Sequence, residues 1–144
     1  MSHNDTQKEL KKAYENTVYK VFNPPMVISV YNTSNELKTL LFNLDITQWA
    51  YITPYNPFGK SYTDAENEEL FNLMLQDIKD YQYYIGEGQG IDTTWPPEKS
   101  VLIIGISKAA AVALGNKYNQ NAIVVGEQGD VAKLEFLAAF ELVK

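Results

Sequence analysis

Three Thr-x-x-Glu sequences mark places in the first half of the chain where a helix can begin, and they constrain the fold strongly. Thr6/Glu9, Thr33/Glu36 and Thr63/Glu66 each have the spacing of a capping box. In a capping box the Thr hydroxyl accepts a hydrogen bond from a free helix N–H, and the Glu side chain bonds back to the Thr N–H. Short β-branched and apolar runs lie between these sites, so helices and strands are expected to alternate.

The three boxes and one later serine predict four helices. The first runs from Thr6 to about Val21, because apolar residues recur there at helical spacing, and Pro24 and Pro25 follow it. The second and third span about Ser34–Asn43 and Asp64–Tyr81. Ser107 caps a fourth, alanine-rich helix, with Gly115 at or just past its end.

Runs of β-branched and apolar residues predict the strands, which are Met26–Tyr31, Gln48–Thr53, Tyr83–Ile85, Val101–Ile106, Ala122–Val125 and Val131–Leu137. Residues 86–99 hold three glycines and two prolines and predict a long irregular loop. Residues 137–144 fit a strand or a helix, and residues 1–5 are expected to form a disordered tail. The pattern predicts an α/β (α+β) sandwich: one domain over residues 1–144, with a mixed sheet of about five to six strands and three to four helices.

The composition excludes several chemistries. The chain has no cysteine and no arginine, and its one histidine, His3, lies in the N-terminal tail. Thiolate nucleophiles, Ser–His–Asp triads and multi-histidine metal sites are therefore excluded. The net charge of −6 argues against a nucleic-acid partner, which needs clustered positive charge. No apolar run reaches the ~20 residues of a membrane span, and the polar start lacks a signal-peptide core, so a cytoplasmic protein without membrane contact is expected.

Asn67 is the most informative single residue, because it lies on the apolar stripe of the third predicted helix. A buried amide without partners costs about 1–3 kcal/mol, so Asn67 needs polar neighbours. The preceding loop contains Asn56 and can supply them. One interpretation is a polar pocket floored by Asn56 and Asn67. The other, which we favour, is that Asn67 holds the backbone of the Asn56–Pro57 turn.

Two further segments carry polar residues. Gln120 and Asn121 precede a strand, where they form either a simple turn, which we favour, or a binding edge. The glycines of residues 86–90 do not match a phosphate loop, since no helix start follows them. Glu87, Asp92 and Glu98 could ligate a metal, but their spacing fits no calcium loop, so no metal or cofactor is predicted.

Glu98 is the strongest of these carboxylates. It lies beside an apolar strand, two residues from Ser100, where burial would raise its pKa. Trp95 either forms a pocket wall or, as we favour, anchors the loop to the core. Tyr81, Tyr83 and Tyr84 would form a recognition surface if they were exposed together.

Several tracts together resemble the bacterial domain-of-unknown-function family 3293. They are Thr53-Pro54-Tyr55-Asn56-Pro57, Asn67 within Ala65-Glu66-Asn67, Trp95 with Glu98-x-Ser100 before Leu102-Ile103-Ile104-Gly105, and Gln120-Asn121-Ala122-Ile123. The resemblance covers about Trp49 to Leu134, with Pro54 where the family more often has Ala. It implies a small, single-domain, cytoplasmic bacterial protein and no particular activity.

These observations lead to three functional hypotheses. The first is a binding module for a small molecule or protein, with an amide-rich site of residues that should converge in space: Asn56, Asn67, Trp95, Glu98, Ser100, Gln120 and Asn121. The second is an enzyme with Glu98 as its catalytic general acid or base. The third is an interaction or antagonist protein that uses an acidic, tyrosine-rich face.

Overall fold

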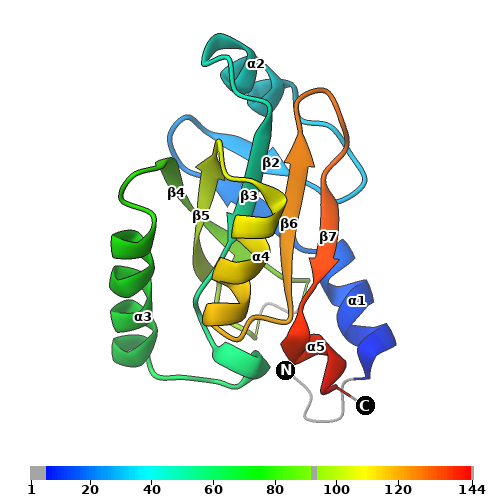
Figure 1. The fold of residues 1–144 in the computed structure, drawn as a ribbon. Helices are drawn as coiled ribbons and strands as arrows, with labels where there is room; N and C mark the ends of the chain where they lie inside the picture. The colour runs from blue at the N-terminus through cyan, green and yellow to red at the C-terminus, as the bar shows by residue number, and fades with distance from the viewer. Residues whose placement is uncertain (1–5, 92–93, 144) are drawn as a thin grey trace.

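The structure is a computed structural model that describes residues 6–91 and 94–143. One curled, seven-stranded sheet forms its centre, with strand order β2-β1-β4-β5-β3-β6-β7 (Figure 1). The elements are α1 (Gln7–Glu15), β1 (Val18–Val21), β2 (Met26–Ile28), α2 (Asn35–Asn43), β3 (Gln48–Ile52), the 3-10 turn η1 (Pro57–Gly59), α3 (Asp64–Asp77), β4 (Gln82–Gln89), β5 (Glu98–Ile104), α4 (Lys108–Lys117), β6 (Ala122–Glu127), β7 (Lys133–Phe136) and α5 (Ala138–Glu141).

The mixed α/β character matches the expectation, but the sheet differs from it in two ways. Every pair of neighbouring strands is antiparallel, so the predicted mixed sheet is wrong. The seven strands and five helices of the described residues also exceed the expected counts. One isolated parallel bridge, Val30 to Ala132, joins the two edges of the curled sheet. Two backbone hydrogen bonds support it: Tyr31 N donates to Ala132 O at 2.8 Å, and Ala132 N donates to Asn32 O at 3.0 Å.

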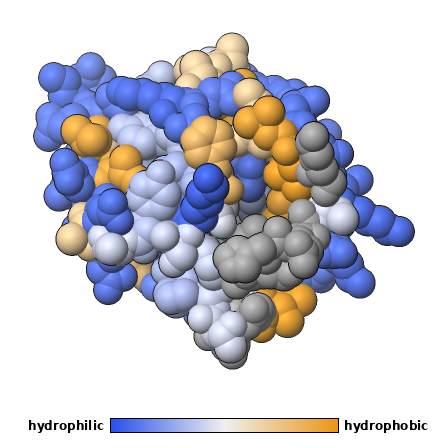
Figure 2. Space-filling model, turned by 90° about the horizontal axis from the view of Figure 1, so that it is seen from below, coloured by the Kyte–Doolittle hydropathy of each residue, from blue (hydrophilic) through white to orange (hydrophobic). Residues whose placement is uncertain are grey.

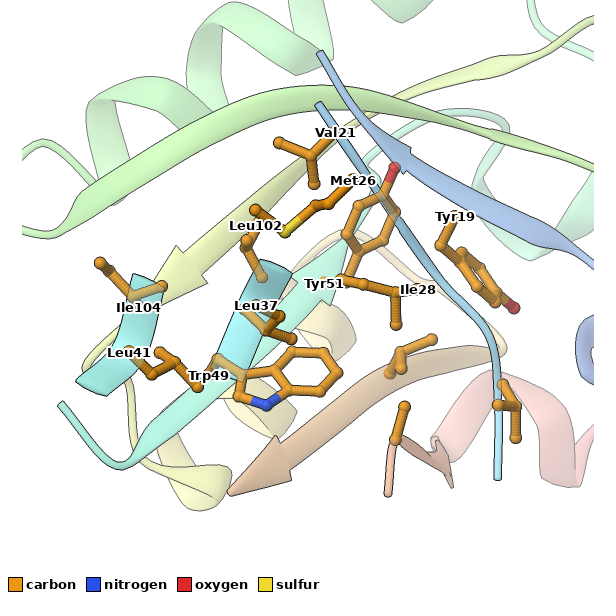
Figure 3. Close-up of a cluster of buried hydrophobic side chains, with 13 residues drawn as sticks. Tyr19, Val21, Met26, Ile28, Leu37, Leu41, Trp49, Tyr51, Leu102 and Ile104 are labelled. Atoms are coloured by element: carbon orange, nitrogen blue, oxygen red, sulfur yellow. The ribbon is translucent and has the colours of Figure 1, made fainter. Parts of the chain in front are cut away.

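The two faces of the sheet carry two separate cores. On the inner face the sheet curls around Tyr19, Trp49, Tyr51 and their neighbours, and Leu37 and Leu41 of α2 cover one end (Figure 3). On the outer face α3 and α4 cover β5, β3 and β6. Because side chains alternate along a strand, the even-numbered residues of β5 point inward and the odd-numbered ones outward.

The predicted first helix is too long. α1 ends at Glu15, and β1 begins at Val18 with alternating exposed and buried residues. The apolar residues of this segment fit a helical period and a strand period equally well. Pairing with β4 decides between them, since Val18–Val21 align with Gln89–Gly86. Tertiary pairing therefore overrides the local helical pattern.

The predicted loop over residues 86–99 is also wrong at both of its ends. β4 continues through Gly86 and Gly88 to Gln89, and β5 already begins at Glu98. A Cβ on Gly86 would lie 1.8 Å from the Lys20 carbonyl oxygen, so glycine here lets β1 approach β4. The glycines that indicated a loop are therefore strand residues at a close backbone contact.

Smaller corrections concern helix ends. Ser34, not Thr33, caps α2, and α3 ends at Asp77 rather than near Tyr81. Gly115 lies inside α4 and is buried against Leu137 and Ile123, so it does not end the helix. The chain closes with the short helix α5 instead of an undecided segment. The predicted disordered tail of residues 1–5 lies outside the described residues.

No helix within residues 6–91 or 94–143 combines the length and the apolar character needed to span a bilayer.

Candidate functional site

The turn that follows β3 is the foundation of the candidate site. Asn56 and Phe58 both have left-handed backbone conformations, with φ of 52° and 59°. Asn tolerates this conformation better than most residues, whereas Phe does not. The turn therefore needs side-chain hydrogen bonds to hold it, and α3 supplies them.

Asn67 of α3 holds this turn through a reciprocal pair of amide hydrogen bonds. The Asn56 backbone N donates to Asn67 Oδ1 at 2.8 Å, and Asn67 Nδ2 donates to Asn56 Oδ1 at 3.0 Å. The capping box of Thr63 and Glu66 forms in full and fixes where α3 begins. Because the start of α3 is fixed, the position of Asn67, one helical turn after the Thr63 cap, is fixed as well. The turn-holding geometry that we favoured for Asn67 is the one observed.

Asn56 extends this network from the turn to Glu98. Its Nδ2 donates to Glu98 Oε2 at 2.7 Å, and Trp95 Nε1 donates to the same oxygen at a longer 3.4 Å. Asn56 Oδ1 also accepts from Tyr62 N at 2.9 Å. We call Asn56, Asn67, Trp95 and Glu98 the polar cluster. Trp95 contacts Glu98 through its indole N–H and is only half-buried.

The environment of Glu98 disfavours its charge. Burial raises the pKa of the Glu98 carboxyl above its usual range, and the hydrogen bonds from Asn56 and Trp95 oppose that rise only in part. No cation contributes to the pKa of this carboxyl. Oε1 has no hydrogen-bond partner within the described part of the chain, and the residue is partly exposed. One oxygen of Glu98 is thus held and the other is open.

Strand pairing places Glu98 in a row with two inward-facing residues that the sequence analysis did not select. Glu98 is opposite Gly88 of β4, and Gly88 is opposite Tyr19 of β1. A Cβ at Gly88 would meet Tyr19 Cδ1 only at 3.7 Å, an ordinary contact distance. Because Gly88 has no side chain, the row lacks one side chain between Glu98 and Tyr19, and we call that position the gap at Gly88. Only the strand register reveals this row, so no local sequence signal could have found it.

Ser100 supports Glu98 rather than lining the opening. It is buried, and its Oγ donates to the Glu98 carbonyl oxygen at 2.8 Å. Thr53 Oγ1 similarly donates to the Lys99 carbonyl oxygen at 2.7 Å. These two bonds fix the backbone at the start of β5.

The segment before β6 attaches to the other side of the turn. Gln120 Nε2 donates to Tyr55 O at 2.9 Å and to Tyr118 O at 3.3 Å, and Phe58 N donates to Asn119 O at 2.8 Å. Asn121 is only 3% exposed, and its Oδ1 has no hydrogen-bond partner, the one such buried side-chain atom among the described residues. An orphaned buried amide oxygen is unusual in a native protein.

All seven residues selected from the sequence therefore lie at one end of the molecule, the lower end in Figure 1. That end carries the turn after β3 and the starts of α3, β5 and β6. Figure 2 views it from below: blue hydrophilic areas predominate at the left, upper and right edges, and pale and orange areas lie in the middle and reach the lower edge. Asn56, Asn67, Trp95 and Glu98 are linked by hydrogen bonds. Gln120 and Asn121 flank the same turn.

Other predicted groupings do not form. Glu87 and Glu98 lie on opposite faces of the sheet by strand alternation, and Asp92 lies outside the described residues. Tyr81 and Tyr83 pack against the outer core and Tyr84 against the inner one, so they do not share an exposed face. Across the described residues, no group of three acidic, cysteine or histidine side chains is placed to hold a metal ion.

The two cavities that stand out lie away from the polar cluster. One of about 250 Å³ lies beside the start of α4, between Lys108 and Lys133. The other, of about 20 Å³, lies beneath α2 and has room for one water molecule. Neither is lined by a residue of the polar cluster.

The fold and the cluster together define a small α/β domain with a curled antiparallel sheet and a recessed carboxylate at one end. Residues 52–123 match the family described as "Protein of unknown function (DUF3293)", and the chain belongs to this family. The resemblance stated from the sequence is thereby confirmed. All seven candidate residues fall inside the matched segment. Among curated proteins and among solved structures, no significant match to the chain is found.

Proposed function

We propose that this protein is a small binding domain that recognises its ligand through Glu98. The amides, which the sequence suggested as ligand contacts, position Glu98 instead. Asn67 hydrogen-bonds to Asn56 and holds the turn, and Asn56 in turn hydrogen-bonds to the Glu98 carboxylate and fixes its position. A bacterial, cytoplasmic setting, expected from the family resemblance, belongs to the same proposal.

A single observation carries the proposal. Glu98 Oε2 accepts two hydrogen bonds, while Oε1 lacks a partner within the described residues. Holding a carboxylate in a fixed position while leaving one oxygen open costs stability, because burial disfavours its charge. Protein groups that keep such a cost commonly serve a site.

Binding is favoured over catalysis because the cluster holds one titratable group that is open to a ligand. The other polar side chains in it are two amides and an indole, which hydrogen-bond but do not exchange protons near neutral pH. The chain offers no cysteine or arginine to add to them. Tyr19 and Tyr55 lie near Glu98, but burial raises the pKa of both hydroxyls, so they remain neutral.

The experiment is a screen by ¹H–¹⁵N NMR of the full chain against mixed small molecules of cationic, neutral and anionic classes. Binding should move the resonances of Trp95 Nε1 and of the backbone around residues 56 and 98. Glu98→Gln should abolish these shifts, whereas Glu36→Gln, an exposed change at the start of α2, should leave them intact. If every class leaves the cluster unmoved, or moves only distant residues, the binding proposal is wrong.

A second candidate is an enzyme in which Glu98 acts as general acid, and the raised pKa of its carboxyl favours this. Carboxyl ¹³C NMR would measure that pKa directly. The enzyme candidate predicts turnover of a bound compound that is lost in Glu98→Gln. Binding without turnover, together with a carboxyl that titrates at its usual pH, would eliminate it.

A protein partner is the third candidate. The separation of Tyr81 and Tyr83 from Tyr84 removes the tyrosine surface on which it was first based. The same NMR experiment addresses a protein ligand when a peptide replaces the small molecule.

A further inference from the structure

The hydrogen-bonding groups around Glu98 indicate the chemical class of its ligand. This inference rests on the proposed binding function and makes it more specific. The side-chain N–H donors of the cluster are already engaged within the protein. Asn56 Nδ2 and Trp95 Nε1 donate to Glu98, and Asn67 Nδ2 donates to Asn56. On the flank, Gln120 Nε2 donates to two backbone carbonyls.

One acceptor of the cluster, in contrast, remains unengaged. Glu98 Oε1 has no hydrogen-bond partner among the residues described, whereas the unpaired Asn121 Oδ1 is buried beyond the reach of a ligand. A ligand that offers only acceptors, such as a phosphate or a carboxylate, would meet the Glu98 carboxylate, and the N–H donors of Asn56, Asn67 and Trp95 are already engaged within the protein. A ligand rich in N–H donors complements this arrangement.

The charge balance points the same way. The nearby Lys99 is not available to Glu98, because its Nζ is 2.8 and 3.0 Å from the two carboxylate oxygens of Glu68 and lies over the Phe71 ring. Lys99 lies on the outer face, whereas Glu98 points inward. The exposed Lys60 in the neighbouring turn makes no contribution to the pKa of Glu98. A recessed carboxylate without a counter-ion is costly, and a bound cation would offset that cost.

The surroundings set the shape of such a cation. The indole of Trp95 lies against the carboxylate, and the Tyr19 ring lies across the gap at Gly88. Aromatic rings attract cations at short range. The gap is the space of one missing side chain, because the site of a Gly88 Cβ is 3.7 Å from Tyr19 and 3.8 Å from Thr17. One carbon at that position would be in ordinary contact with both side chains, so a narrow alkyl chain is the shape expected there.

We propose that the Glu98 site binds a primary alkylammonium group, with N–H donated to Glu98 Oε1 and the alkyl chain over Gly88. The same chemistry is found in free diamines and polyamines and in the lysine side chain of a peptide.

The test compares three four-carbon probes of matched size: butylammonium, 1-butanol and butyrate. Putrescine and Nα-acetyl-lysine methylamide then distinguish a free amine from a lysine side chain. ¹H–¹⁵N NMR titration of the full chain measures each affinity. Butylammonium should shift the resonances of Trp95 Nε1 and of the amides of residues 88 and 98. Its affinity should be at least about tenfold higher than that of butanol, a difference of about 1.4 kcal/mol in binding free energy. Butyrate should not bind.

Two variants locate the effect. Glu98→Gln keeps the shape of the side chain and removes its charge, so it should lower the affinity for butylammonium by at least about tenfold. Gly88→Ala fills the gap without a clash, so it should lower the affinity for the alkylammonium probes while leaving Glu98 in place. Glu36→Gln is the control and should bind like the parent chain. The spectrum of each variant reports whether it is folded, so loss of binding and loss of fold are separated.

The outcomes separate this inference from the proposed function. If butanol or butyrate binds at the cluster and butylammonium does not, the amine class is wrong and the binding function stands. If butylammonium binds equally to Glu98→Gln, Glu98 is not the recognition group and both proposals fail. If no probe and no compound of the wider screen moves the cluster, the binding function itself fails.

Discussion

Removing the Asn67 side chain tests the argument that a pair of buried amides holds the site together. Asn67→Ala deletes two hydrogen bonds and leaves the Asn56 backbone N–H without its partner in a region where both residues are buried. Each lost hydrogen bond contributes about 0.5–1.5 kcal/mol, and an unsatisfied buried N–H costs about 1–3 kcal/mol. These contributions overlap, so the expected loss is about 3 kcal/mol of unfolding free energy. For a chain of this size that corresponds to a fall in Tm of roughly 6–12 °C.

The measurement is urea and thermal unfolding followed by circular dichroism. Asn72→Ala is the matched control, because Asn72 lies on the same helix but is exposed. It should change stability by no more than about 0.5 kcal/mol. A loss below about 1 kcal/mol for Asn67→Ala, or a loss equal to that of the control, would refute the reasoning. In the Asn67→Ala variant the Trp95 Nε1 resonance should also move, since Asn56 no longer holds Glu98 in place.

Three further predictions follow from the same structure. Gly86→Ala should destabilise the protein by about 3 kcal/mol or more, because the new Cβ would lie 1.8 Å from the Lys20 carbonyl oxygen. Gly88→Ala, two residues further along β4, should fold normally. Equal urea midpoints for the two variants would contradict the register of β1 and β4. Folding raises the pKa of the Glu98 carboxyl above its ordinary value of 4.5, so the folded chain holds the carboxyl proton to a higher pH than the unfolded chain does. The free energy of unfolding should therefore fall as the pH rises from 4.5 through the raised pKa, and it should stay lower at higher pH. Glu98→Gln should remove that slope, so its stability relative to the parent should grow between pH 4 and 8 in urea titrations; a constant difference at every pH would show that the carboxyl is not perturbed. Asn121→Leu should stabilise the protein by up to about 1–3 kcal/mol, because it removes an orphaned buried oxygen, and a lower Tm would mean that this oxygen has a partner.

Features that depend on local sequence were predictable. The Thr63/Glu66 capping box forms with both of its hydrogen bonds, because its partners are three residues apart. Asn67 could be identified from its place on an apolar stripe, and its partner Asn56 from the turn just before. These inferences need only the geometry of one helix and one loop.

Features that depend on strand pairing were not predictable. Residues 18–21 have a helical period, yet they form β1 because β4 pairs with them from far along the chain. Gly86 and Gly88 resemble loop residues until that pairing shows that Gly86 permits a close backbone approach. Tyr19 reaches the neighbourhood of Glu98 through the same two strands. The sequence therefore identified the residues of the polar cluster, but it did not indicate that Tyr19 lies in the same row as Glu98.

The bridge between Val30 and Ala132 has a consequence for how the protein folds. It joins two residues that lie far apart in the sequence, so its formation closes a long loop of chain. Pairings between distant residues slow folding, since chain entropy is lost before the contact is gained. β2 and β7 are the end strands of the sheet, and unpaired strand edges are where chains associate wrongly. Closure at this bridge therefore joins the chain beside these two edges, although β2 and β7 are not paired with each other.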